Sequence, residues 1–283
     1  MANKNQFYNA FTAYLKKNKF SSILILIFLA TIAIVLIISL FKTVATQSDY
    51  VYAKVKVSQG LWWISSQKPG WWFVNSLKKG EEEFDILGKP IAEILEVRYY
   101  PTIPFSPEYE TEYNIYVTLK LAVNKNTRTQ TYLFKRSQIS VGRPIELEFP
   151  STHLTGSILE LSEKEFGKEY SQKVVTITKK LAYPWEYDAI KVGDKQFDGE
   201  NHVFEVINKN ATPTSAFDSD PFGNIQFYTR ESRRYITVRG TIMVRQRGGE
   251  LVFGEEQVVK PGNFIYLTTS GFVFDRFLVE SIR

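Results

Sequence analysis

The chain contains no cysteine and only two histidines among its 283 residues. Without cysteine it forms no disulfide, binds no metal through thiolates and has no cysteine nucleophile. His153 and His202 are too few for a histidine-rich metal centre, and neither has an acidic or serine partner at a catalytic spacing. Glycine loops of the phosphate-binding type are also missing. The sequence therefore predicts no cofactor, no metal and no enzymatic activity.

Acidic residues are absent before position 43, whereas five lysines lie there. The whole chain has 35 basic and 30 acidic residues, so 30 of each remain from position 43 onward. A nucleic-acid-binding domain needs an excess of basic charge on its folded part. We therefore expect no nucleic-acid partner.

One long apolar run stands out, at residues 23–41. It contains 19 residues without a charge, and a helix of that length rises about 28 Å, close to the thickness of a bilayer core. The lysines before it predict a single-pass protein of the cytoplasmic membrane, with the N-terminus inside and the rest outside. Residues 1–22 are predicted to be a cytoplasmic amphipathic segment. The alternative is a cleaved signal peptide, but the apolar run is longer than such peptides usually have.

Beyond residue 45 apolar and polar residues alternate, and no amphipathic helical run is obvious. Alternation with period two is typical of half-buried strands. The clearest sets are Val51, Ala53, Val55 and Val57; Ile115, Val117, Leu119, Leu121 and Val123; and Ile236, Val238, Ile242 and Val244. The predicted fold is mainly β: an N-terminal transmembrane helix followed by two tandem, similar domains of β-sandwich or barrel-like type.

The duplication is indicated by matches at nearly constant displacement. Trp72, Leu77, Gly80, Phe84 and Asp85 match Trp185, Ile190, Gly193, Phe197 and Asp198, displaced by 113. Tyr113 matches Tyr235 at 122, Gly142 matches Gly262 at 120, and Leu154, Ile158 and Leu159 match Phe274, Leu278 and Val279 at 120. Copy one is predicted at 48–163, a linker at 164–171 and copy two at 172–283. The change in displacement predicts a longer loop in copy two, between residues 207 and 234.

Two sets of candidate residues follow from the duplication. A residue present in both copies is interpreted as serving the fold, so we predict a repeat core of Trp72, Gly80, Phe84, Trp185, Gly193 and Phe197. Aromatic residues in the tryptophan-rich segment 62–72 and in two loops, 98–112 of copy one and 207–234 of copy two, are candidates for contact with a partner or glycan. These are Trp62, Trp63, Trp71, Tyr99, Tyr100, Tyr109, Phe217 and Phe222. The tryptophans have two further interpretations, core packing and contact with the membrane surface.

Residues 20–163 also resemble an uncharacterised family of bacterial single-span membrane proteins, known from cyanobacteria as a domain of unknown function. The resemblance rests on the apolar run, a Val55-x-Val57 strand and a Trp/Leu segment ending at Gly80. A Phe-Asp pair, Gly88, Ile91, Ile94 and the element Val141-Gly142-x-Pro144-Ile145 follow. The resemblance implies a location and a fold but no activity.

The function predicted from these observations is that of a noncatalytic, membrane-anchored, extracytoplasmic protein. It would act as a structural, adaptor or interaction module of the cell envelope, bound to the bilayer through residues 23–41 and to a protein or envelope polymer. The alternative is a glycan-binding module, and an unrecognised envelope hydrolase is a third hypothesis. Nothing in the sequence indicates the oligomeric state.

Overall fold

The computed structural model describes residues 23–24, 27–37, 49–58, 68–102, 111–126, 128–167, 170–219 and 221–283, and of 215–219 and 226–231 the backbone alone. The chain divides into two units, Met1–Ser48 and Asp49–Arg283. The predicted segment 1–22 lies outside the described residues.

In the first unit residues 23–24 and 27–37 are helical, and all their side chains are exposed. The hydroxyl of Thr31 donates a hydrogen bond of 2.8 Å to the carbonyl oxygen of Phe28 within the helix. Among the residues that the structure describes, no helix is long and apolar enough to cross a membrane.

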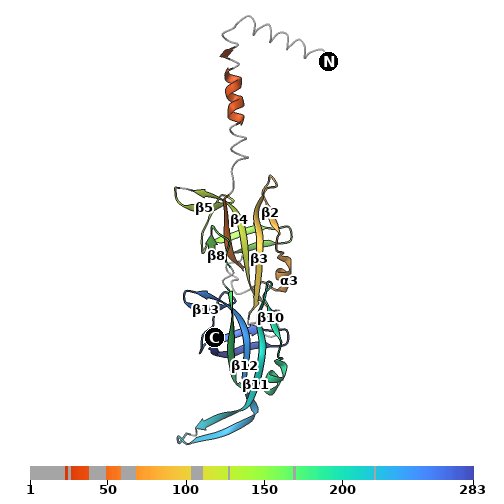
Figure 1. Ribbon diagram of the computed structural model, residues 1–283, viewed down its shortest axis with the longest axis vertical. Helices are drawn as coiled ribbons and strands as arrows, with labels where there is room; N and C mark the ends of the chain where they lie inside the picture. Colours follow the sequence, from red (N-terminus) through yellow and green to blue (C-terminus); the bar gives the residue numbers. More distant parts are fainter. Residues whose placement is uncertain are drawn as a thin grey trace. The chain divides into compact units, whose positions relative to one another are not determined.

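The second unit consists of two curled antiparallel sheets. The first follows the order β2-β3-β4-β1-β8-β7, with β5 and β6 attached to β4. Its strands are β1 (Asp49–Ser58), β2 (Glu82–Phe84), β3 (Pro90–Pro101), β4 (Tyr113–Asn126), β5 (Thr131–Phe134), β6 (Ser137–Ile139), β7 (Pro144–Glu148) and β8 (His153–Ser162). The short helix α3 (Trp71–Ser76) precedes β2 (Figure 1).

The second sheet repeats this order strand for strand, as β10-β11-β12-β9-β16-β15, with β13 and β14 attached to β12. Its elements are β9 (Tyr170–Ala182), α4 (Pro184–Ala189), β10 (Lys195–Phe197), β11 (His202–Ser219), β12 (Ile225–Arg247), β13 (Glu250–Phe253), β14 (Gln257–Val258), β15 (Phe264–Thr268) and β16 (Val273–Ile282). The mainly β fold with two tandem, similar modules is therefore confirmed. Below, module one is residues 49–162 and module two is residues 170–283. Strand β9 begins within the predicted linker.

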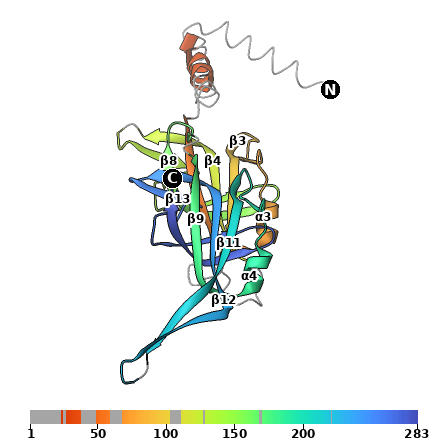
Figure 2. The same ribbon diagram turned by 60° about the horizontal axis from the view of Figure 1, so that its bottom comes forward.

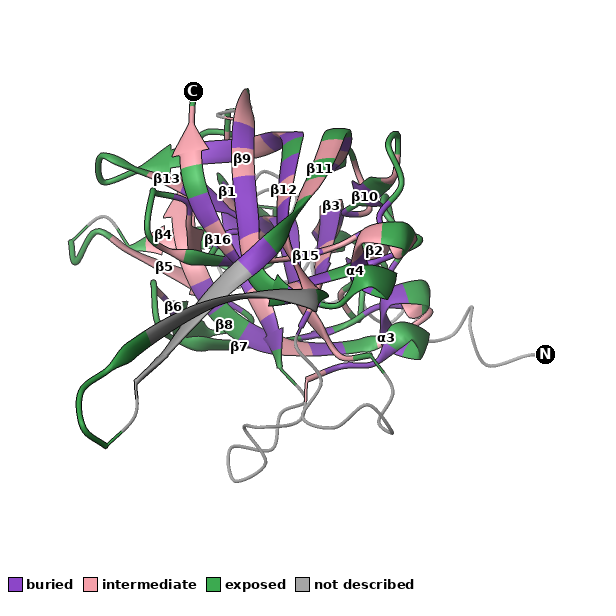
Figure 3. Ribbon diagram, turned by 90° about the horizontal axis from the view of Figure 1, so that it is seen from below, coloured by how far each residue is buried: buried purple, intermediate pink, exposed green. Residues whose placement is uncertain are grey.

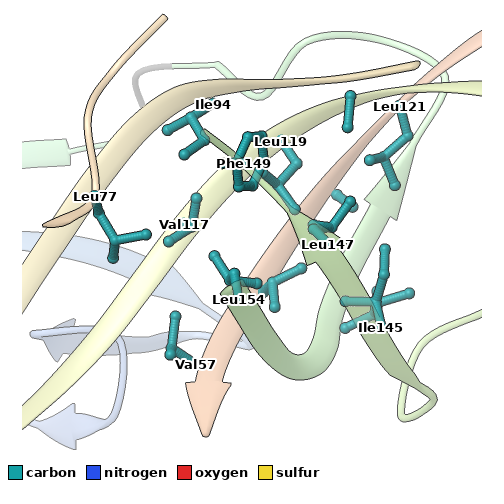
Figure 4. Close-up of a cluster of buried hydrophobic side chains, with 14 of the residues drawn as sticks. Val57, Leu77, Ile94, Val117, Leu119, Leu121, Ile145, Leu147, Phe149 and Leu154 are labelled. Atoms are coloured by element: carbon teal, nitrogen blue, oxygen red, sulfur yellow. The ribbon is translucent and has the colours of Figure 1, made fainter. Parts of the chain in front are cut away.

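The alternating residues fill one core in each module. In β1 the side chains of Val51, Ala53, Val55 and Val57 are all buried, as the period-two pattern requires. They pack with apolar residues of β4, β7 and β8 (Figure 4). Burial of such side chains is the main force that stabilises each module.

The glycine turns before β2 and β10 are the same in both modules. The amide of Gly80 donates to the carbonyl of Ile94, and the amide of Gly193 donates to that of Val206, both at 2.8 Å. Both glycines have positive φ, 81° and 91°, a conformation that costs glycine little. The two glycines are therefore turn residues rather than residues of a repeat core.

Three of the predicted matches are wrong by one residue: Tyr113 with Tyr235, Ile158 with Leu278, and Leu159 with Val279. Ile94 pairs with Leu119, and its counterpart Val206 pairs with Gly240, so β4 and β12 are displaced by 121 rather than 122. In β16 one additional residue shifts the register between Phe274 and Phe277, where Arg276 has a φ of 57°. This β-bulge makes Val279, not Leu278, the counterpart of Ile158, and it moves the counterpart of Leu159 to Glu280.

The insertion in module two is a β-hairpin and not a loop. After a register shift between Pro213 and Thr214, β11 and β12 remain paired. Their paired residues run from Thr214 opposite Arg230 to Ser219 opposite Ile225. Figures 1 and 2 show this arm projecting from the second sheet.

Candidate interaction surface

Helix α3 is positioned by three side chains that enter the core of module one. Phe73, Val74 and Leu77 are buried, and they fix the inner face of a helix that begins after Gly70. Its outer face carries Trp71 and Trp72.

Helix α4 has the same position in module two but is held by an ion pair. Pro184 is its first residue, where the missing N–H costs nothing. The buried carboxylate of Glu186 accepts hydrogen bonds from the amide of Tyr183 at 2.7 Å and from Lys179 at 2.6 Å. The equivalent positions in module one are Phe73 and Val57. Apolar side chains of module one therefore occupy the positions that an ion pair occupies in module two.

The matched tryptophans lie on the outer faces of these helices, so the prediction that they form the repeat core is wrong. Trp72 is 63% exposed and Trp185 is 61% exposed. The matched Phe84 and Phe197 are about half exposed as well. The core positions of both helices are already filled, which leaves these aromatic rings to the solvent. Figures 2 and 3 show α3 and α4 on the same side of the unit.

Aromatic neighbours surround each tryptophan helix differently. Trp71 packs against Tyr99 and Tyr113 with ring centroids 5.6 and 5.7 Å apart. In module two Tyr183 and Trp185 lie nearly parallel, at 17° with centroids 6.4 Å apart. Both rings are exposed. Module two thus has a stacked pair of rings, with the guanidinium of Arg233 over Tyr183, 3.4 Å from the ring centroid. The rings around Trp71 meet at angles of 46° or more.

The remaining contact candidates are scattered. Tyr100 is buried at the junction of the modules and is not a surface residue, so that prediction is wrong. Phe222 is exposed at the tip of the arm, and Phe217 pairs with Phe227 within it. Trp62, Trp63 and Tyr109 lie outside the described residues.

The junction of the two modules, here called the seam, centres on Asp198 in the β10–β11 turn. One oxygen of its carboxylate, which is fully buried, accepts hydrogen bonds from Arg98 at 2.8 Å and from the hydroxyl of Tyr100 at 2.9 Å. The other oxygen accepts hydrogen bonds from the backbone amides of Glu200 and Asn201 at 3.0 and 2.7 Å. Burial and the charge of Asp198 raise the pKa of Tyr100 well above its ordinary value, so its hydroxyl keeps its proton and donates.

A second part of the seam is the β13–β14 turn, which carries two acidic residues onto β1. Glu255 is buried and forms ion pairs with Lys54 at 3.2 Å and with Arg245 at 3.3 Å. Glu256 pairs with Lys56. Arg245 also reaches Glu160 of β8 at 2.6 Å. Buried charges of the two modules are therefore paired with each other, as charged groups removed from water require.

Sequence reasoning matched Asp198 with Asp85 as a residue that serves the fold, and it missed the seam contacts of Asp198. The signal was a difference between the copies. Asp198 is followed by Gly199 and Glu200, whereas Asp85 is followed by Ile86 and Leu87.

The seam predicts that stability falls in acid. Burial pushes the pKa of Glu160 and Glu256 upward, but the hydrogen bonds from Arg245 and Lys56, with nearby positive charges, outweigh it and leave both pKa values below the ordinary 4.5. A carboxylate whose folded pKa is depressed stabilises the fold above its unfolded pKa, and this contribution disappears as the pH falls through the folded value. We expect the melting temperature to fall below about pH 4.5. Glu160→Gln should flatten that decline, and an unchanged pH profile in this variant would contradict the assignment.

The close approach of the modules at Gly199 gives a further prediction. A Cβ at Gly199 would lie 2.5 Å from the carbonyl oxygen of Val97, and its φ is 104°. Gly199→Ala should therefore cost more than the roughly 1 kcal/mol of an ordinary positive-φ glycine. Gly88→Ala is the matched control, since its φ is 76° and nothing lies within 4 Å. Denaturant unfolding measures the loss of unfolding free energy in each variant. Equal losses would show that Gly199 does not pack closely against Val97.

No cluster of metal-ligating side chains is found among the described residues. His153 contacts Glu146 on the surface, and His202 packs beside Phe197. Comparison with known proteins finds no matching family model, no matching curated protein and no matching solved structure. The geometry of the chain itself therefore carries the functional argument.

Proposed function

We propose that the chain is a noncatalytic, membrane-anchored interaction module of the cell envelope, with Trp72 and Trp185 as its principal contact residues. The observation that carries this proposal is that both modules expose a tryptophan at the same place, on a helix whose core positions are filled by other residues. Tryptophan is enriched where proteins bind partners, because it offers a large rigid surface and one hydrogen-bond donor. Two equivalent sites on one side suit a partner that both modules engage.

The membrane anchor is the second part of the proposal. The helical residues 27–37 expose only apolar side chains and Thr31, whose hydroxyl is satisfied within the helix. Such a surface is favoured in lipid and not in water. With residues 23–41 in the cytoplasmic membrane, the lysines before them favour an inside N-terminus. The full chain should stay with membranes after alkaline washing, and its recovery in the soluble fraction would refute the anchor.

The interaction site is tested by crosslinking in intact cells followed by capture of the tagged full-length chain. Trp72→Ala with Trp185→Ala should abolish recovery of the partner. Because both side chains are exposed, the free energy of unfolding should change by less than about 0.5 kcal/mol. Phe264→Ala, which removes an aromatic ring 69% exposed on β15, is the matched control. Equal recovery by the double variant and the control would rule out the tryptophans as the contact.

A glycan partner is favoured by one observation, the exposed ring of Trp185, which lies nearly parallel to Tyr183 and the Arg233 guanidinium that covers it. Flat aromatic faces can stack on the apolar face of a sugar ring. In this case envelope polysaccharide should bind the purified chain, and Trp185→Ala should weaken binding more than Trp71→Ala, whose ring meets its neighbours at an angle. Binding that neither substitution changes would exclude this alternative.

A further inference from the structure

The β10–β11 turn of module two is a docking element. It begins at Asp198, whose carbonyl oxygen accepts the amide of Tyr99 at 2.8 Å. Gly199 lies against Val97, and Glu200 pairs with Lys79 at 3.0 Å. The residues of this turn that contact module one are thus one glycine and two acids. The two acids face basic side chains, Arg98 and Lys79.

The equivalent turn of module one, between β2 and β3, is built for an apolar neighbour. Asp85 holds it by accepting the amides of Leu87 and Lys89 at 2.8 and 2.9 Å. Its tip consists of Ile86 and Leu87, which are 103% and 80% exposed. Among the described residues no other pair of neighbouring aliphatic side chains in the Asp49–Arg283 unit is as exposed.

The strand register places this turn at the end of module one where the chain enters it. Ala92 of β3 pairs with Leu121 of β4, and Leu121 pairs with Val51 of β1. The turn that precedes β3 therefore lies at the same end of the sheet as Asp49, the first residue of β1. Seven residues, 42–48, separate Asp49 from the apolar run, and they span less than about 30 Å when fully extended.

We propose that Ile86 and Leu87 insert into the outer leaflet of the bilayer that holds residues 23–41. The inference rests on the proposed anchor, because the short connection keeps this end of module one close to the lipid. Branched aliphatic side chains on a rigid turn enter the acyl region at little conformational cost. The turn would hold module one against the membrane, as its counterpart holds module two against module one.

The absence of cysteine makes a direct test possible. Three single-cysteine variants of the full-length chain, Ile86→Cys, Ala33→Cys and Val192→Cys, are labelled with an environment-sensitive fluorophore and reconstituted into phosphatidylcholine vesicles. Ala33 lies in the apolar run, and Val192 is an exposed apolar residue of module two. Labels at Ile86 and Ala33 should shift to shorter emission wavelengths and lose intensity to a quencher carried on the lipid chains. The label at Val192 should do neither.

Each outcome separates the two proposals. Quenching at Ala33 without quenching at Ile86 overturns the insertion and leaves the anchor intact, whereas quenching at neither position overturns the anchor. Quenching at Ile86 in native membranes but not in pure lipid would assign the turn to a membrane-protein partner and overturn lipid insertion. Adding Leu87→Asp to the Ile86→Cys variant should withdraw the label from lipid without unfolding the chain, because both residues are exposed.

Discussion

Replacing Asp198 by alanine is expected to lower the free energy of unfolding of the Asp49–Arg283 unit by about 3–5 kcal/mol, because it leaves two buried donors without their acceptor, although Arg98 keeps its ion pair with Glu96. Arg98 is 6% exposed at its side chain and would lose the carboxylate at 2.8 Å. The hydroxyl of Tyr100 would lose its acceptor as well. Guanidinium denaturation of the full-length chain in mild detergent, followed by circular dichroism, measures the loss.

The duplication provides the control for this experiment. Asp85 holds the equivalent turn of module one through two amide hydrogen bonds, but it faces no buried arginine. Asp85→Ala should cost only about 1 kcal/mol, the net contribution of ordinary hydrogen bonds. Similar losses in both variants would show that Asp198 acts as a turn residue alone. Arg98→Ala combined with Asp198→Ala should cost less than the sum of the single substitutions, since the two groups contact each other.

The parts of the fold that local patterns specify were predictable from the sequence. Alternation in Val51–Val57 identifies β1, because one face of the strand must be apolar. The glycines at 80 and 193 mark turns with positive φ, a requirement that operates within a few residues. Their constant displacement was enough to predict the duplication.

The register errors have a physical cause. A β-bulge adds one residue to a strand without a characteristic composition, and the one in β16 has an arginine, Arg276, at positive φ. Matching apolar residues at a fixed displacement therefore continued one residue out of step. The arm was interpreted as a loop for a similar reason, since the turn-forming residues of 210–223 do not show that the strands around them stay paired.

The surface and the seam were less accessible to sequence reasoning. A six-residue helix is too short for a visible helical period, so nothing indicated that Phe73 and Glu186 point inward while Trp72 and Trp185 point outward. Lys54 is buried by a turn 201 residues away in the chain, although it is one of the polar residues that alternate with the apolar ones in β1. Contacts between modules depend on how the two modules pack, which no local pattern encodes.

Phe274→Ala should have a comparably large effect, for a different reason. Phe274 is fully buried in module two, with the rings of Phe272, Phe277 and Phe204 centred 4.9, 5.2 and 5.5 Å away. Removing a buried phenylalanine costs about 3–5 kcal/mol, through lost burial and the cavity left behind. Phe264→Ala on the adjacent strand β15 is the control, since that ring is mostly exposed and its removal should cost less than about 0.5 kcal/mol.

The same variant tests whether the seam makes the two modules unfold together. Four of the five tryptophans lie in or before α3 of module one, and module two has only Trp185, so tryptophan emission reports mainly on module one. Circular dichroism reports on the strands of both. The buried ion pairs of Asp198 and Glu255 join the modules, and we expect Phe274→Ala to shift both transitions to the same lower denaturant concentration. If the emission transition stays at its wild-type midpoint while circular dichroism shows a separate earlier step, the seam does not couple the modules. Asp198→Ala should then leave module one at its original stability too.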